Sequence, residues 1–239
     1  MAEIAIRAQN LSFRYPHAEN NALSDLSLEI PRYSCTVILG PNGAGKSTLF
    51  SLICGLLKSE QQVEFPCFDS SKRFMSYGTQ NCALYDSLSV YENLEFFGKL
   101  MDVEDLFQKI LSLCDSLALT EHLQKRISSC SGGTRQRTHF AVSMLCEAPL
   151  LILDEPFNNI DPESRLLLKA CLRDYLSKQK GTLVLSSHQL EALDDLWTDL
   201  IFIKSGRVKE TLRKSENFRD SRLEALFFEL KESSETVSR

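Results

Sequence analysis

Apolar and polar positions alternate in the first part of the chain and then cluster into short apolar runs. Residues 3–39 alternate apolar and polar side chains around a turn at 15–21, which predicts a β-rich opening. The runs at 150–153, 182–185 and 200–203 are continuously apolar, which is typical of strands buried on both faces of a parallel sheet. A further strand-like segment lies at 75–78.

Between these strands the apolar spacing becomes helical. From Ser89 to Gln124 apolar residues recur every three or four positions, and after a break at 128–133 a helix is predicted from about 134 to 147. Residues 162–178 predict another helix, with Pro162 in its first turn. Strands that alternate with helices indicate an α/β fold with a parallel sheet, here interrupted by an all-helical middle.

Composition and charge remove several classes of protein. Of the 239 residues, 43% are hydrophobic and 25% charged, which is ordinary for a globular protein. The net charge of -5 argues against a nucleic-acid surface built on bulk charge, so no nucleic-acid partner is expected. No run of 18 apolar residues predicts a membrane span, and the N-terminus does not resemble a secretory signal. The 8 cysteines lack C-x-x-C and zinc spacing, so we expect reduced thiols in the cytoplasm.

Residues 40–47 read G-P-N-G-A-G-K-S and fit the phosphate-loop pattern G-x-x-x-x-G-K-[ST] at every fixed position. A β-type segment, 35–39, precedes them, and apolar residues at helical spacing follow them, so the motif has a strand, a turn and a helix N-terminus. Glycines let backbone N–H groups converge on an anion, and the helix end adds partial positive charge. Lys46 would reach the β- and γ-phosphates, and the Ser47 hydroxyl would bind Mg²⁺.

Asp154 and Glu155 follow the apolar run 150–153, at the strand end where α/β sheets place ligands. Asp154 is predicted to hold Mg²⁺, directly or through water, and Glu155 to polarise an attacking water. The alternative is a pair of solvated carboxylates in a turn before Pro156.

Three further positions carry weaker signals. Ser131-Gly132-Gly133 precedes a helix and predicts a second anion-binding helix N-terminus, which a partner's nucleotide would occupy in a dimer, although the tripeptide is also common in loops. His188 follows a buried strand and is predicted to approach the same sheet end as Glu155, but a single histidine is more often structural. Gln80 by itself indicates no function.

Together these motifs resemble, in their order and over nearly the whole chain, the nucleotide-binding subunits of ABC transporters. The resembling positions are Tyr15 as the aromatic that stacks on adenine, Gly40-Pro41-Asn42-Gly43-Ala44-Gly45-Lys46-Ser47-Thr48 as Walker A, Gln80 as the Q-loop glutamine, Ser131-Gly132-Gly133 as the signature core, Leu150 to Glu155 as Walker B, Asp161 as the D-loop acid and His188 as the switch histidine. Phe13 is an alternative to Tyr15.

The resemblance implies a fold and roles that the residues alone do not give. It implies a P-loop NTPase with a RecA-like parallel sheet, an antiparallel β subdomain and an inserted helical subdomain. The nucleotide-binding core would comprise 1–85 and 149–215, the helical signature subdomain 86–148, and a C-terminal helix and tail 216–239. Two copies, or this subunit and a related one, would close head-to-tail on two ATP molecules. Gln80 would sense Mg²⁺ and the transmembrane partner, and His188 would contact the γ-phosphate.

This sequence departs from the family pattern at the signature, where Cys130 stands in place of the usual leucine and Thr134 in place of glutamine. Because the serine and glycines are kept, Cys130 is predicted to alter packing below the loop rather than phosphate contact. The stretch between Walker A and Gln80 is compact, which predicts a reduced antiparallel β subdomain.

The segment 87–97 and the tail 222–230 resemble exporter-type ATPases, which predicts a bacterial export subunit on the cytoplasmic face of the inner membrane, paired with separate permease subunits. The alternative for the tail is a surface helix that packs its apolar stripe. Residues 85–88 would line the groove that receives a coupling helix, or form a solvated loop. The alternatives are an ABC ATPase that is not tied to transport, a phosphate-loop kinase or GTPase, and a subunit that only binds nucleotide. No N-K-x-D motif supports a GTPase.

Overall fold

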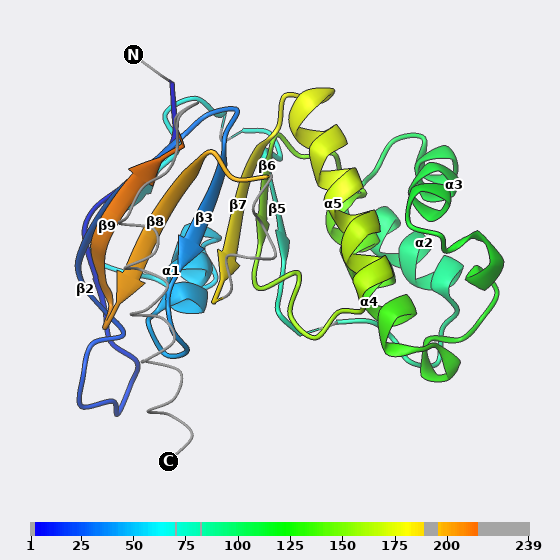
Figure 1. Cartoon of the computed structure of the whole chain (residues 1–239), viewed down its shortest axis with the longest axis horizontal. Helices are drawn as coiled ribbons and strands as arrows, with labels where there is room; N and C mark the ends of the chain where they lie inside the picture. Colours follow the sequence, from blue (N-terminus) through cyan, green and yellow to red (C-terminus); the bar gives the residue numbers. More distant parts are fainter. Residues whose placement is uncertain (1–2, 70, 82, 189–195, 215–239) are drawn as a thin grey trace. The chain divides into compact units, whose positions relative to one another are not determined.

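The computed structural model describes residues 3–69, 71–81, 83–188 and 196–214 (Figure 1). Their contacts divide the chain into two compact units. The first unit comprises Met1–Lys72 and Thr182–Arg239, and the second comprises Arg73–Gly181. The predicted tail helix at 222–230 and the predicted C-terminal subdomain at 216–239 lie outside the described residues.

The first unit contains two sheets. One is antiparallel with the strand order β2-β1-β4, and β4 is only 2 residues long. In the other, β7, β3 and β8 are parallel neighbours, and β9 pairs antiparallel with β8 (Figure 1). The elements are β1 (Ile4–Phe13), β2 (Leu23–Pro31), β3 (Cys35–Leu39), α1 (Lys46–Ile53), β4 (Val63–Glu64), β7 (Thr182–Ser187), β8 (Asp199–Lys204) and β9 (Arg207–Arg213).

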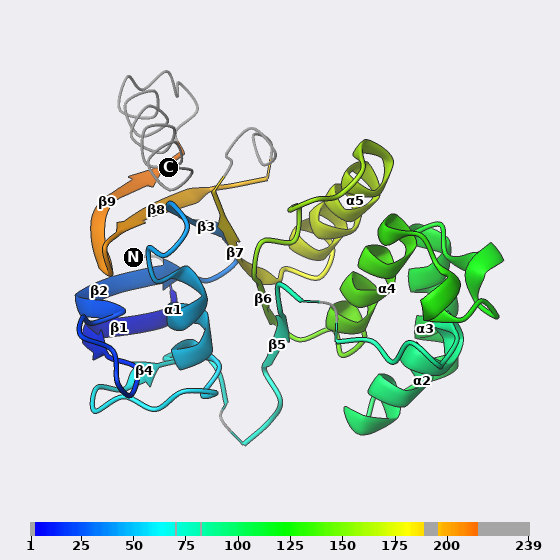
Figure 2. The same ribbon diagram turned by 90° about the horizontal axis from the view of Figure 1, so that it is seen from below.

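Burial explains why these runs form strands. Every residue of β3 is buried, as expected for an apolar run that has strands on both sides and covered faces. Helix α1 lies between the two sheets of this unit (Figure 2), where its Leu49 and Phe50 have no exposed surface. The buried parallel strands and the β-rich opening predicted from the sequence are confirmed.

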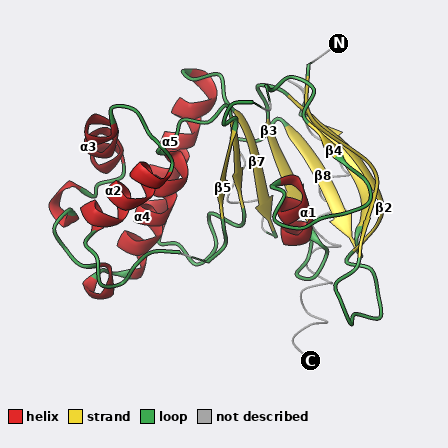
Figure 3. Ribbon diagram, turned by 180° about the vertical axis from the view of Figure 1, so that it is seen from behind, coloured by secondary structure: helices red, strands yellow, loops and turns green. Residues whose placement is uncertain are grey.

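The second unit is mainly helical, whereas α1 is the one helix among the described residues of the first unit (Figure 3). Its strands β5 and β6 pair in parallel, with Gly78 opposite Leu153. The elements are β5 (Met75–Gly78), α2 (Val90–Leu100), α3 (Leu106–Ser116), the 3-10 turns η1 (Thr120–His122) and η2 (Ile127–Ser129), α4 (Gly132–Met144), β6 (Leu150–Leu153) and α5 (Pro162–Ser177).

The structure refines several predicted boundaries. The helical stretch 89–124 is divided into α2, α3 and η1, because turns at 101–105 and 117–119 separate the amphipathic faces. The helix expected at 134–147 begins earlier, at Gly132, and ends at Met144. Strand β9 was not predicted, although Ser205 and Gly206 have φ of 51° and 70°, the conformation of a tight hairpin turn.

Two other expectations concern thiols and membranes. Within the described ranges the cysteines are free thiols, and Cys35 and Cys114 are buried. Among the residues that the structure describes, no helix is both long and apolar enough to cross a membrane.

The start of α2 is held by polar contacts. Ser89 caps the helix by accepting from Glu92 N, and the Glu92 carboxylate accepts from Ser89 N in return. Asn93 has no exposed surface, and its amide bonds both backbone groups of Tyr85 and the carbonyl of Ser89. Asn93 therefore fixes the loop between Tyr85 and the helix.

We predict that Asn93→Ala lowers the free energy of unfolding by about 2 kcal/mol, because it removes three hydrogen bonds made by a fully buried side chain, including the bond that Tyr85 N donates to it. Denaturant unfolding measures the change. Lys99→Ala on the same helix, at an exposed side chain, is the control and should stay within about 0.5 kcal/mol of wild type. Equal stabilities of the two variants would contradict the proposal that the Asn93 side chain stabilises the loop before α2.

Candidate nucleotide-binding site

The glycine-rich loop begins where β3 ends. Gly40 N donates to Ser187 O at 3.3 Å, and Ala44 N donates to Pro41 O at 3.2 Å, which folds the loop back toward the strand. Gly45, the residue before α1, has φ of 103°. A β-carbon there would lie 2.7 Å from the Ala22 carbonyl oxygen, so only glycine fits this turn.

Lys46 places a positive charge inside this loop. Its side chain is buried, and Nζ donates to the carbonyl oxygens of Gly40 at 2.8 Å and Pro41 at 3.2 Å. Ser47 follows on the first turn of α1 and is exposed. A phosphate would add charged acceptors to a lysine that already lies at the N-terminus of a helix. The loop therefore has the chemistry of a phosphate site.

Tyr15 lies beside the same helix. Its hydroxyl is 3.1 Å from the Thr48 hydroxyl, and its ring packs edge-on against Phe13, with centroids 5.0 Å apart. Of the two aromatics Tyr15 is the more exposed, with 43% of its surface accessible. An exposed aromatic next to a phosphate loop can present its face to a base. Tyr15 is thus the more accessible of the two rings.

His188 also belongs to this end of the sheet. It directly follows β7, whose last residue, Ser187, is paired with Leu39 and accepts the Gly40 hydrogen bond. His188 is half-buried. Within the first unit, therefore, the fold gathers the loop, Tyr15 and His188 around the carboxyl ends of β3 and β7.

In the second unit, Asp154 and Glu155 follow β6. Both residues are largely buried, at 4% and 9% exposure, and Asp154 N donates to Gly78 O at 2.9 Å. Glu155 has φ of 49°, a left-handed conformation that is unfavourable for a bulky residue, and Asn158 Nδ2 donates to its Oε2 at 3.2 Å. Backbone strain of this kind gathers at functional sites. Asn158, which the sequence analysis did not single out, helps to hold the Glu155 carboxylate.

Gln80 lies at the neighbouring strand end. β5 stops at Gly78, and Gln80 is exposed two residues later, beside the connection that carries Asp154. A small cavity here is lined by Thr79, Asp154 and the ring of His139, among others. Burial lowers the pKa of His139.

Mg²⁺ can be tested against these donors. In the second unit Gln80 and Asp154 offer amide and carboxylate oxygens, and in the first unit Ser47 offers a hydroxyl oxygen; these are the ligand types that Mg²⁺ prefers. Within the described ranges, no group of three or more His, Cys, Asp or Glu side chains gathers into a metal cage.

Ser131 caps α4. Its hydroxyl accepts from Thr134 N at 3.2 Å, while Ser131 and Gly132 are exposed and a β-carbon at Gly132 would meet open space. Cys130 is half-buried, and its thiol contacts Arg126 O at 3.3 Å, away from the exposed helix end. The exposed end of α4 is accessible to an anion.

Asp161 lies next to this turn. Its carboxylate caps α5 by accepting from Ser164 N at 2.9 Å, and these hydrogen bonds hold its pKa below the usual range, with a smaller effect from Arg137. A β-carbon on Gly133 would overlap the Asp161 carboxylate. Arg137 reaches back to Gly133 O at 3.4 Å and to Leu117 O at 2.9 Å. The second unit therefore brings Asp161 and the signature glycine into contact.

Comparison with known proteins agrees with this geometry. Residues 23–158 match the family model of the ABC transporter. The tungstate uptake system ATP-binding protein TupC of Peptoclostridium acidaminophilum is 34% identical over 189 residues, covering 77% of this chain and 88% of TupC. The sulfate/thiosulfate import ATP-binding protein CysA of Mesostigma viride is 29% identical over 215 residues, covering 87% of this chain and 61% of CysA.

A solved structure shows the same fold. A dimeric ATP-binding cassette in a post-hydrolysis state, bound to ADP and Pi, superimposes with a TM-score of 0.76 at 21% identity, covering 87% of this chain and 98% of that one. This chain belongs to the ABC transporter family, as an ATP-binding domain with the P-loop NTPase fold.

We predict that Gly133→Ala displaces the Asp161 carboxylate and removes the cap of α5, at a cost of about 1 kcal/mol in unfolding free energy. Gly132→Ala, one residue earlier, meets no neighbour and is the matched control. Thermal unfolding of both variants measures the difference. A loss of stability in both, or in neither, would contradict the proposed contact between Gly133 and Asp161.

Proposed function

We propose that this chain is the ATP-binding and ATP-hydrolysing subunit of a transporter whose membrane-spanning part is formed by separate subunits. The observation that carries the proposal is the set of buried charged groups at strand ends. Lys46, Asp154 and Glu155 are each less than 10% exposed. Burying such groups costs free energy unless a charged ligand or polar partners compensate for it. Polar partners already offset part of this cost, as the carbonyl oxygens of Gly40 and Pro41 do for Lys46, and MgATP would add negative charge for Lys46 and positive charge for the carboxylates.

Binding is proposed to use the phosphate loop and Tyr15. Backbone N–H groups of residues 40–48 and the Lys46 ammonium would hold the phosphates, and the Tyr15 ring would stack on adenine. Mg²⁺, when bound, neutralises charge between the phosphates. Ser47, Asp154 and Gln80 are the residues that would hold it.

Hydrolysis is proposed to depend on Glu155 and His188. The Glu155 carboxylate, oriented by Asn158, accepts a proton from the attacking water as that water adds to the γ-phosphorus and the bond to ADP breaks. His188, just beyond β7, donates a hydrogen bond to the γ-phosphate. The products are ADP and inorganic phosphate, and no acceptor substrate is needed, which distinguishes this proposal from a kinase.

A second copy, or a related subunit, is proposed to complete the site. The exposed N-terminus of α4 at Ser131-Gly132-Gly133 can bind the γ-phosphate of a partner's ATP. The Asp161 carboxylate, in contact with Gly133, would join the same interface. The dimeric cassette with ADP and Pi supports this arrangement by its likeness in fold.

The transport direction expected from the sequence was export. The relatives named above are uptake and import proteins, so they give export no support. The proposal is accordingly ATP-driven transport, with export as one direction that the membrane subunits would decide. An ABC ATPase that is not tied to transport is the second candidate, and it differs in having no membrane partner.

An aromatic cluster favours the membrane partner. The rings of Tyr85, Phe96 and Phe97 pack on one another with centroids 5.0 to 6.0 Å apart, yet Tyr85 and Phe96 remain 49% and 41% exposed. Exposed aromatics that form a cluster are typical of protein contact sites. The cluster lies at the loop that was expected to receive a coupling helix.

We predict that Glu155→Gln binds ATP but loses about 10²- to 10⁴-fold in turnover, and that it remains an ATP-bound dimer. Phosphate release and size-exclusion chromatography with ATP measure the two effects. Glu163→Gln, an exposed glutamate in the first turn of α5, is the control and should behave as wild type. Wild-type protein that binds ATP but never releases phosphate, with or without membrane subunits, would overturn the proposed activity.

We predict that Phe96→Ser abolishes co-purification with a polytopic membrane protein, while ATP binding is unchanged. Phe107→Ser removes a phenylalanine of α3 that is also exposed, at 56% against 41% for Phe96, and lies outside the cluster, so it should leave co-purification intact. Affinity purification from solubilised membranes tests both variants. If wild-type protein captures no membrane protein, the candidate that is not tied to transport is favoured.

A further inference from the structure

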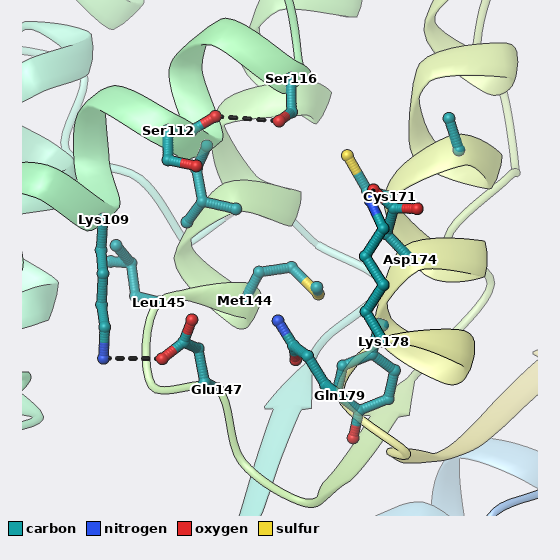
Figure 4. A pocket seen from close by; sticks show the side chains of 13 residues that line it. Lys109, Ser112, Ser116, Met144, Leu145, Glu147, Cys171, Asp174, Lys178 and Gln179 are labelled. Atoms are coloured by element: carbon teal, nitrogen blue, oxygen red, sulfur yellow. Dashed lines mark hydrogen bonds and ion pairs between the residues drawn. The ribbon is translucent and has the colours of Figure 1, made fainter.

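A cavity of about 380 Å³ lies within the second unit, away from all the residues assigned above (Figure 4). It opens between α3 and the second half of α5, and the end of α4 forms its floor. This volume is in the range of sites for small organic ligands. The lining side chains are Lys109, Ser112, Leu113, Ser116, Met144, Leu145, Glu147, Ala170, Cys171, Asp174, Tyr175, Lys178 and Gln179.

The floor of the cavity is apolar. Met144 and Leu145 are nearly or fully buried, and Met144 points into the cavity between the two helices (Figure 4). Tyr175 is also buried and presents its ring, because its hydroxyl donates to Ala148 O at 2.8 Å. An aliphatic or thioether-sized group can therefore be buried here without leaving a polar atom unpaired.

Both walls carry an ion pair. On the α3 side Lys109 Nζ is 2.8 Å from Glu147 Oε2, and on α5 Lys178 Nζ is 2.8 Å from Asp174 Oδ2. The formal charges in the cavity cancel, so neither a nucleotide nor a metal ion would find a net countercharge. A molecule with one positive and one negative group can use both walls. This is the charge pattern of a zwitterion.

From this combination we propose that the cavity binds a small zwitterion with apolar side chains, of the size of a dipeptide. Lys109 is 27% exposed and Lys178 is 73% exposed, so Lys109 is the less solvated cation and holds the ligand carboxylate. The ammonium group then lies at Asp174 on the opposite wall. Cys171 borders the site as a neutral thiol, because burial raises its pKa to about 11.

The position of the cavity gives binding a consequence. Helix α4 runs from Ser131 to the floor at Met144, and α5 runs from the Asp161 cap to the wall at Asp174. Glu147 precedes β6, which ends at Leu153, directly before Asp154. A ligand that bridges α3 and α5 therefore acts on the far ends of elements whose near ends carry candidate site residues. An effect of the bound ligand on ATP hydrolysis would rest on the proposed function, whereas binding of the ligand to the cavity does not.

Titration calorimetry with nucleotide-free full-length protein tests binding, with L-leucyl-L-leucine as the probe. We expect saturable heat with a dissociation constant of about 1 mM or tighter. L-leucyl-L-leucinamide, which lacks the carboxylate, and glycylglycine, which lacks the apolar groups, should each bind at least about tenfold more weakly. Absence of saturable heat with the parent dipeptide would overturn the proposal, as would equal affinity for all three probes.

Matched variants locate the site. Ser116→Phe should fill the mouth of the cavity and abolish the heat, whereas Ser177→Phe on α5 should not. Both serines are exposed and bond a carbonyl four residues earlier, so they differ mainly in whether they line the cavity. Retained binding in Ser116→Phe, with its fold verified by circular dichroism, would overturn the location.

Lys109→Met tests the assigned orientation. It should weaken binding of L-leucyl-L-leucine about tenfold and leave L-leucyl-L-leucinamide unaffected, since only the carboxylate loses a partner. An equal loss for both probes would contradict a carboxylate at Lys109. Since heat is measured without ATP, a protein that fails to hydrolyse ATP but binds the dipeptide would refute the proposed function and leave this inference standing.

Discussion

Pairing between the ends of parallel strands is the constraint on which the candidate site depends. Gly40 N bonds Ser187 O where β3 and β7 end, and Asp154 N bonds Gly78 O where β5 and β6 end. These hydrogen bonds extend the pairing between the strands by one residue beyond the end of β3 and of β6. Because parallel strands end at a common edge, the loops that follow them are held side by side. The phosphate loop joins His188 in this way, and Asp154 joins the segment that leads to Gln80.

The charged groups at these edges are buried more deeply than charged residues usually are. Lys46 is 5% exposed and Asp154 is 4% exposed. Such burial is tolerated where backbone carbonyls or N–H groups compensate the charge, as they do for Lys46. In the second unit, the left-handed backbone of Glu155 adds strain beside Asp154.

Helices α4 and α5 begin at neighbouring caps. Ser131 caps α4, Asp161 caps α5, and the lack of a β-carbon on Gly133 allows the two turns to touch. A rigid helix transmits a shift at one end to the other end. Helices α4 and α5 therefore connect their N-terminal caps with the cavity at their C-terminal halves. Arg137 strengthens this unit by tying Gly133 to the end of α3.

The sequence by itself determined the buried parallel strands, the phosphate loop and the order of the motifs. Those signals are local: continuous apolar runs, helical spacing and a glycine pattern whose chemistry is fixed within eight residues. Through the family resemblance it also indicated Tyr15 as the aromatic that stacks on adenine, and in the structure Tyr15 packs beside α1 as an exposed ring.

Only the tertiary structure decided what depends on contacts between distant segments. The contact of Gly133 with Asp161, the support of Glu155 by Asn158 and the cavity between α3 and α5 have no sequence period. The β8–β9 hairpin was within reach of the sequence, since Ser205-Gly206 is a turn signal, but the polar alternation of β9 was weak. Such features depend on packing between residues that are far apart in the chain, so a local sequence pattern does not predict them.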